Sequence, residues 1–122
     1  MMINLFQKKQ SKIHSGIDSD FKIECNALTD KDFETLAYLI NKKRKFKKVI
    51  GIPPGGLRLA EALKKYCDVQ SNTLLIVDDV LTAGISMEAE YANNKEDFIE
   101  GIVIFARGKC PEWVTPIFQM NI

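Results

Sequence analysis

The residues best suited to chemistry stand in one stretch, where two aspartates precede a short hydroxyl-bearing segment. Asp78 and Asp79 end the apolar run Leu74–Val77, and the segment Thr82–Ser86 follows them. Ionised carboxylates only accept hydrogen bonds, so the pair suits the hydroxyls of a sugar diol or, indirectly, a divalent cation. The N–H groups of a loop that opens a helix suit a phosphate. The stretch therefore predicts a site for a phosphorylated sugar with Mg²⁺, although two solvated aspartates before an ordinary turn would give the same pattern.

A glycine-rich turn earlier in the chain has a similar layout. Pro53–Gly56 lies between a short apolar run, Val49–Ile52, and a helical pattern that extends from Leu57 to about Tyr66. A strand, a turn and a helix again present N–H groups at the carboxyl end of a strand, which favours a second anion site. A plain strand-to-helix turn is the alternative. The nearest arginine is Arg58.

Strands and helices alternate in the elements that must position these turns. Thr29 followed by Asp32 is typical of a capped helix start, and the apolar spacing of the next residues predicts a helix that ends near Lys42–Lys45. A further helix follows Ser86, and Phe98–Ala106 is a predicted strand. This alternation indicates a small parallel sheet whose crossovers are right-handed.

The N-terminal segment is expected to contribute little to the sheet. Residues Met1 to Ser11 are polar and poorly patterned, which predicts a frayed arm. Phe21, Ile23 and Cys25 alternate with polar residues, as in a half-buried strand, so an N-terminal hairpin covering the core is predicted.

Composition limits the class of protein. The chain has 122 residues and a net charge of +1, which predicts one domain over residues 1–122 and no strong attraction to nucleic acid or membranes. The basic run Lys42–Lys48 is interpreted as a solvated helix end, with nucleic-acid binding as the alternative. No apolar run could span a bilayer, the N-terminus lacks a signal segment, and three widely spaced cysteines favour a cytoplasmic protein. So small a sheet makes a homodimer the expected state.

The stretch Leu75–Ser86 resembles the phosphoribosyl pyrophosphate (PRPP) motif of type I phosphoribosyltransferases. The resemblance implies that Asp78 and Asp79 are the catalytic pair, which binds the ribose 2′ and 3′ hydroxyls and reaches Mg²⁺ only through ribose or water. It implies that the loop binds the 5′-phosphate, through Thr82, Ala83, Gly84, Ile85 and Ser86. The earlier turn resembles the family's pyrophosphate loop, which implies pyrophosphate binding by Pro53, Pro54, Gly55, Gly56 and Arg58. Pro54 stands where many members carry a basic residue.

Two shorter resemblances bear on the base and disagree. An apolar strand ending in Arg107 and followed by an aromatic residue is similar to the base-binding region of xanthine–guanine phosphoribosyltransferases. It implies base contacts by Arg107 or Lys109, stacking by Trp113 and contacts from the backbone of Val114. The alternative for Trp113 is a structural role, as a plug in the core or at the edge of the sheet. Ser15, Gly16 and Ser19 before a strand resemble the hood of orotate phosphoribosyltransferases, although Asp18 stands where a basic residue is usual. The base, purine or pyrimidine, therefore stays open.

The chain departs from the family between its two loops. Only 78 − 55 = 23 positions separate Gly55 from Asp78, which leaves no room for the flexible hairpin that closes over the substrate in family members. The resemblance implies an α/β fold, a small Rossmann-like parallel sheet flanked by helices, with a hood from the N- and C-terminal segments. It implies a transferase that moves phosphoribosyl between pyrophosphate and a nucleobase, with PRPP–Mg²⁺ or a nucleoside monophosphate as ligand. The missing hairpin keeps a second hypothesis open, a non-catalytic module that senses PRPP or nucleotides.

Overall fold

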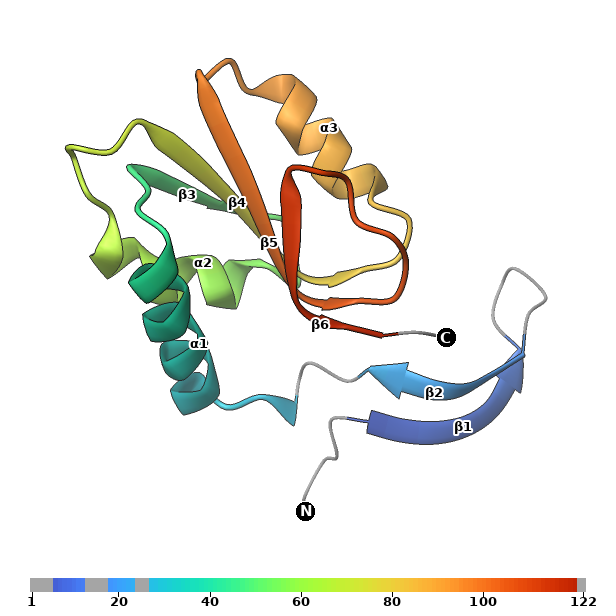
Figure 1. Ribbon diagram of the computed structural model, residues 1–122. Coiled ribbons are helices and arrows are strands. Elements are labelled where there is room, and N and C mark those ends of the chain that lie inside the picture. The colour runs from blue at the N-terminus through green and yellow to red at the C-terminus, as the bar shows by residue number, and fades with distance from the viewer. Residues whose placement is uncertain (1–5, 13–17, 24–26, 121–122) are drawn as a thin grey trace.

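A four-stranded parallel sheet forms the body of the protein (Figure 1). The computed structural model describes residues 6–12, 18–23 and 27–120. The strand order is β3–β4–β5–β6, and the bounds are Lys48–Gly51, Thr73–Leu81, Phe98–Ala106 and Val114–Gln119. Gly51 pairs with Val77, and Leu81 pairs with Ala106, so the carboxyl ends of the strands meet at one edge. The predicted α/β class with a small parallel sheet is confirmed.

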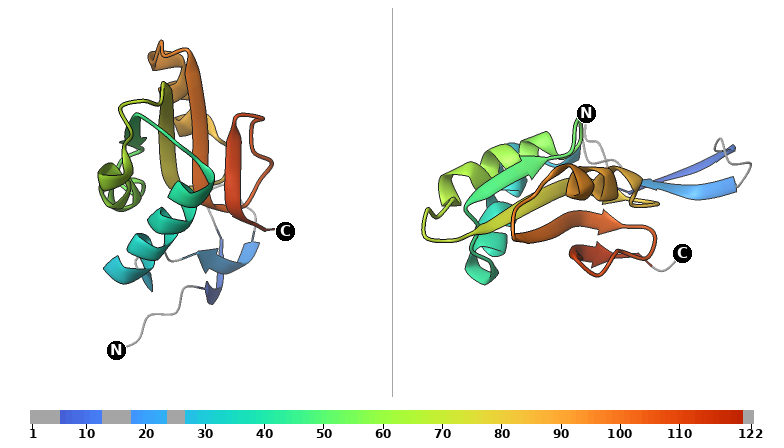
Figure 2. Two further views of the ribbon diagram at one scale, coloured as in Figure 1. Left: turned by 60° about the vertical axis from the view of Figure 1, so that its left-hand side comes forward. Right: turned by 90° about the horizontal axis from the view of Figure 1, so that it is seen from above.

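Helices cover both faces of the sheet. Helices α1 (Asp30–Lys43) and α2 (Leu57–Leu63) pack on one face, and α3 (Ile85–Asn93) packs on the other, as Figure 2 shows. The central strand β4 is buried from both sides over Leu74–Val77, because alternate residues enter the two core clusters. Strands covered on both faces are nearly continuous apolar runs, which is why this run was recognisable as a strand.

The helix boundaries follow local signals. Helix α1 begins after Thr29, whose hydroxyl accepts a hydrogen bond from the N–H of Asp32 at 3.2 Å while its own N–H donates to the Asp32 carboxylate at 2.8 Å. This capping box and the buried residues Phe33, Ala37 and Ile40 confirm the predicted helix. Helix α2 continues into a short 3₁₀ turn over Lys64–Tyr66, close to the predicted end.

One crossover has the unexpected hand. The chain passes from β3 through α2 to the neighbouring strand β4, and then from β4 through α3 to the next strand β5. Both steps cross the sheet in the same direction, but α2 and α3 cover opposite faces. The two crossovers therefore have opposite hands. Figure 2 shows a right-handed β4–α3–β5 crossover and a left-handed β3–α2–β4 crossover. The prediction of right-handed crossovers is therefore wrong for α2. About 98% of such connections are right-handed. Here residues 67–72 lead directly from the 3₁₀ turn after α2 into β4, the neighbour of the edge strand β3.

Two terminal strands were also mispredicted. Strand β6 was not expected, because Pro116 within it removes a hydrogen-bond donor; β6 lies at the edge of the sheet, where proline is tolerated. The predicted frayed arm contains β1 (Phe6–Lys12), which pairs antiparallel with β2 (Asp18–Ile23). The predicted N-terminal hairpin is therefore present, but it projects beyond the carboxyl ends of the sheet (Figure 1) and does not cover the core. Ser15, Gly16 and Cys25 lie outside the described residues.

No helix within the described ranges is both long and apolar enough to cross a membrane.

Candidate active site at the carboxyl edge of the sheet

At the carboxyl edge of the sheet, the chain leaves the neighbouring strands β3 and β4 toward opposite faces. After β3 the chain turns toward α2 on one face, whereas after β4 it turns toward α3 on the opposite face. Neighbouring parallel strands whose connections leave in opposite directions open a crevice, and α/β proteins bind ligands in such crevices. The left-handed crossover produces this arrangement although the strand order never reverses. Both sequence-predicted anion loops start from this crevice, at Ile52 and at Thr82.

The acidic pair lies within β4, which continues to Leu81 and does not end at Asp79 as predicted. Each carboxylate accepts a hydrogen bond from the N–H of the next residue. The N–H of Asp79 donates to Oδ1 of Asp78 at 2.8 Å, and the N–H of Val80 donates to Oδ1 of Asp79 at 2.7 Å. Val77 and Val80 both pack on the α1–α2 side, so the strict alternation of the strand is broken between them. The local backbone therefore sets where both carboxylates lie.

The environment of Asp78 disfavours its charge. Burial and then a hydrogen bond between the Asp78 and Asp79 side chains raise the pKa of Asp78 from 3.8 to about 7, although the hydrogen bond from the backbone N–H of Asp79 acts in the opposite direction. Two carboxylates that share a site cannot easily both ionise, and one of them then holds a proton. Such a perturbed acid in a crevice is typical of functional sites.

The loop after β4 forms a hollow beside this pair. Its volume is ≈ 380 Å³, and it is lined by Asp78 and by the run from Val80 to Met87. Gly84 caps α3 with φ = +76°, a left-handed conformation that glycine adopts without a penalty. The first N–H groups of a helix have no partner within it, and the helix dipole adds positive charge there. Thr82 and Ser86 are exposed on this loop. The hollow has the size and chemistry for a phosphate.

The glycine-rich turn after β3 contacts Asp79 of the acidic pair. The Pro53–Pro54 peptide bond is cis, and the N–H of Gly56 donates to the carbonyl of Ile52 at 2.7 Å. A Cβ atom at Gly55 would overlap the carboxylate of Asp79, so any other residue at position 55 would have to displace that carboxylate. The structure thus brings together the two loops that the sequence predicted separately.

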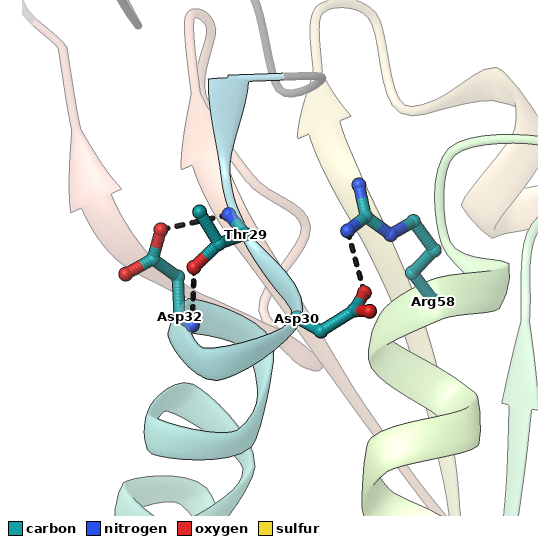
Figure 3. Close-up of polar contacts among 4 residues, drawn as sticks. All are labelled: Thr29, Asp30, Asp32 and Arg58. Carbon is teal, nitrogen blue, oxygen red and sulfur yellow. Dashed lines mark hydrogen bonds and ion pairs between the residues drawn. The ribbon is translucent and has the colours of Figure 1, made fainter.

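Arg58 is near this turn but has its own partners. Its Nη2 lies 2.8 Å from Oδ1 of Asp30 at the start of α1, as Figure 3 shows. Its guanidinium also lies 4.5 Å from the centre of the Phe33 ring. Asp30 is almost fully exposed, so the ion pair is weakly held. Arg58, the second residue of α2, thus contacts the start of α1 through this exposed ion pair and through the Phe33 ring.

The predicted base-binding residues separate into two groups. Arg107 and Lys109 follow β5 at the carboxyl edge, and the N–H of Arg107 donates to the carbonyl of Leu81 at 2.8 Å. Trp113 instead packs over Gly101, five residues before the end of β5, which is roughly 16 Å along the strand. Val114 is buried, and its N–H donates to the carbonyl of Pro111 at 3.0 Å. The structure brings Arg107 and Lys109 to the edge, but not Trp113 or Val114.

Similarity to solved structures is found in fold alone. No protein-family model and no curated protein matches the sequence. Orotate phosphoribosyltransferase from Aeropyrum pernix superposes with a TM-score of 0.76 and 16% identity, over 95% of this chain and 88% of that chain. The orotate enzyme from Francisella tularensis gives 0.67 and 17%, over 94% and 80%. The chain has the type I phosphoribosyltransferase fold.

A purine member of this fold covers less of the chain. The xanthine–guanine–hypoxanthine phosphoribosyltransferase of Helicobacter pylori superposes with a TM-score of 0.51 and 15% identity, over 71% of this chain and 85% of that chain. The orotate enzymes thus match more of this phosphoribosyltransferase fold.

Two residues near the carboxyl edge of this phosphoribosyltransferase fold, Phe118 and Gln119, were not predicted as site residues, because the strand that carries them, β6, was not predicted. The amide of Gln119 donates to the carbonyls of Ala106 and Gly108, at 3.3 and 3.1 Å, and so holds the turn after β5. Phe118 stacks on Phe105 with ring centres 5.3 Å apart, and half of its surface is exposed near the carboxyl edge. The sequence indicated them only as an aromatic and a polar residue near the end of a segment that contains Pro116.

Proposed function

We propose that the protein binds PRPP or a nucleoside 5′-monophosphate and transfers phosphoribosyl between pyrophosphate and a nucleobase. The observation that carries this proposal is the contact between the glycine-rich turn and the acidic pair, next to a phosphate-sized hollow. A ligand with a sugar diol between two phosphate groups matches that order of features. The fold shared with orotate phosphoribosyltransferases supports the reaction class.

Different residues of the site would bind successive parts of the ligand. Thr82–Ser86 would hold the 5′-phosphate, and Asp78 and Asp79 would accept hydrogen bonds from the ribose hydroxyls. Pro53–Gly56 and Arg58 would face the pyrophosphate. Arg107 and Lys109 are the candidate residues for binding the base. The bond from C1′ to the pyrophosphate oxygen breaks, and the pyrophosphate leaves with its electron pair. A ring nitrogen of the base bonds to C1′ and releases its proton to the solvent. Catalysis then rests on orientation and on stabilisation of charge at the leaving group.

Mg²⁺ fits this donor set only together with the ligand. No group of three or more potential metal-binding side chains occurs in the part of the chain that the structure describes. Magnesium commonly binds through one or two carboxylates, substrate phosphates and water, which is compatible with Asp78 and Asp79 acting indirectly. Bound with PRPP, the ion would neutralise charge on the departing pyrophosphate.

A second function, nucleotide sensing without turnover, is favoured by the short connection in the left-handed crossover. Only residues 67–72 join the 3₁₀ turn to β4, so this connection holds no long hairpin that could close over a substrate. An open site lets water compete for the reactive sugar. A homodimer in which the partner covers the site would restore the closure, and we propose that state for the active form.

Incubation with PRPP and Mg²⁺ distinguishes the two functions. Orotate, uracil, adenine, guanine, hypoxanthine and xanthine are supplied one at a time, with orotate first because orotate enzymes cover more of the fold. Nucleotide formation with any base supports the transferase, and PRPP binding without product supports the sensor. The variant Asp78→Asn/Asp79→Asn should lose PRPP binding in either case. If the unaltered protein binds neither PRPP nor a nucleoside monophosphate, both proposals fail.

A further inference from the structure

The segment between β5 and β6 wraps around the phosphate loop and the start of α3. Its first residue, Arg107, donates its N–H to the carbonyl of Leu81 at 2.8 Å. Gly108 approaches the carbonyl oxygen of Thr82 so closely that a Cβ atom would overlap it. The ring of Pro111 lies 3.8 Å from where a Cβ of Gly84 would be. The segment for which the resemblance implied base binding thus contacts the backbone at the end of β4 and at Thr82, and lies beside Gly84.

Trp113 ends this segment and holds a carboxylate of α3. Its Nε1–H donates to Oε1 of Glu88 at 2.8 Å, and its ring centre lies 4.7 Å from that of Tyr91. The ring covers Gly101, where a Cβ would lie 2.7 Å from it. Glu88 belongs to the first turn of α3, and its N–H donates to the carbonyl of Gly84 at 2.9 Å. Both edges of the indole are therefore engaged by the body of the protein.

The position of Glu88 matters for any anion in the hollow. An acidic residue in the first turn stabilises a helix, but its charge also opposes a phosphate at the same helix end. Because Trp113 lies beside Gly101, the middle of β5, its hydrogen bond holds the Glu88 carboxylate toward the amino side of the sheet. The phosphate hollow lies at the opposite, carboxyl edge.

We propose that Trp113 is a positioning residue for phosphate binding, which acts by keeping the Glu88 carboxylate away from the hollow. This inference rests on the proposed function, since it assigns the hollow to a sugar phosphate. It replaces stacking on a base as the role of Trp113. Without the indole N–H, the Glu88 side chain is free to turn toward the helix start, where it repels the bound phosphate.

Calorimetric titration with ribose 5-phosphate and, separately, with inorganic pyrophosphate tests the proposal. Trp113→Phe keeps an aromatic ring over Gly101 but removes the donor, and we expect about three- to tenfold weaker ribose 5-phosphate binding. Glu88→Gln should bind at least as tightly as the unaltered protein. The double variant Trp113→Phe/Glu88→Gln should recover to within about twofold, because the repelling charge is gone. Tyr91→Phe is the matched control and should change nothing.

The outcomes separate this inference from the proposed function. Unchanged affinity in Trp113→Phe, or a double variant as weak as that single variant, overturns the positioning role while leaving sugar phosphate binding intact. Equal weakening of ribose 5-phosphate and pyrophosphate also overturns it, because a general loss of structure affects both loops. If the unaltered protein binds no ribose 5-phosphate, both the proposed function and this inference are refuted.

Discussion

The backbone of Gly55 lies directly against the carboxylate of Asp79, so the two halves of the candidate site are in van der Waals contact. Gly55 belongs to the turn after β3, and Asp79 belongs to β4. A side chain at position 55 would have to displace the carboxylate. The contact therefore couples the predicted pyrophosphate turn to the predicted ribose-binding pair.

Replacing Gly55 with alanine should damage both stability and ligand binding. The new Cβ overlaps the Asp79 carboxylate, and overpacking of this kind costs about 1–3 kcal/mol. Urea unfolding measures the stability, and calorimetry with PRPP measures the binding. In Gly55→Ala/Asp79→Ala the overlap is relieved, so the stability should return above that of Gly55→Ala. Additive losses in the double variant would show that the contact is not the cause.

The stability should fall as the pH rises from about 4 to 7. Because the folded state raises the pKa of Asp78 to about 7, the folded chain binds more protons than the unfolded chain in this interval. A single proton sets an upper limit of about 1.4 kcal/mol per pH unit, and Asp78 is only half-buried, so we expect a smaller slope. The free energy of unfolding from urea titrations at pH 4.5, 5.5, 6.5 and 7.5 checks this.

Asp78→Asn should flatten that dependence and raise the stability above pH 7, while abolishing PRPP binding. The amide has nearly the shape of the carboxylate but carries no charge, so its burial is less costly. Asp97→Asn, at an exposed connector, is the matched control and should keep the slope. A slope that persists in Asp78→Asn would assign the titration to another group.

The left-handed conformation at Gly84 predicts an order of stability among its variants. A Cβ there would have its nearest neighbours at 3.8 Å, so space is not limiting and φ = +76° decides the cost. Asparagine tolerates this conformation better than alanine, and valine tolerates it least. We expect Gly84→Asn, Gly84→Ala and Gly84→Val to unfold at progressively lower urea concentrations. Equal midpoints for asparagine and valine would contradict this.

Arg58 and Asp30 should respond in opposite directions to pyrophosphate. If Arg58 faces the pyrophosphate, Arg58→Ala weakens its binding, whereas Asp30→Asn frees the guanidinium and leaves the binding equal or tighter. The exposed ion pair contributes at most about 1 kcal/mol to folding, so both variants should stay folded. Calorimetry with inorganic pyrophosphate measures the difference. Equal weakening in both variants would mean that the pair only aligns α1 with α2.

Local signals in the sequence determined three of the four strands of the central sheet, β3, β4 and β5, and the composition of both loops. The apolar run Leu74–Val77 is buried from both sides, and Thr29 with Asp32 forms the capping box. Gly84 stands where the chain needs a positive φ. These features depend on residues close in sequence, whose preferences the tertiary structure did not override.

Only the tertiary structure decided the relationships across the sheet. Whether α2 returned left- or right-handed, and so whether a crevice opened between β3 and β4, depended on packing between α1, α2 and the sheet. The placement of Trp113 against Glu88, 25 positions away, likewise followed from the pairing of β6 with β5. Strand β6 was not predicted, because proline at position 116 is unusual within a strand. Periodicity reports which side of an element is buried, but the partner across a long loop is selected by the packing of the whole chain.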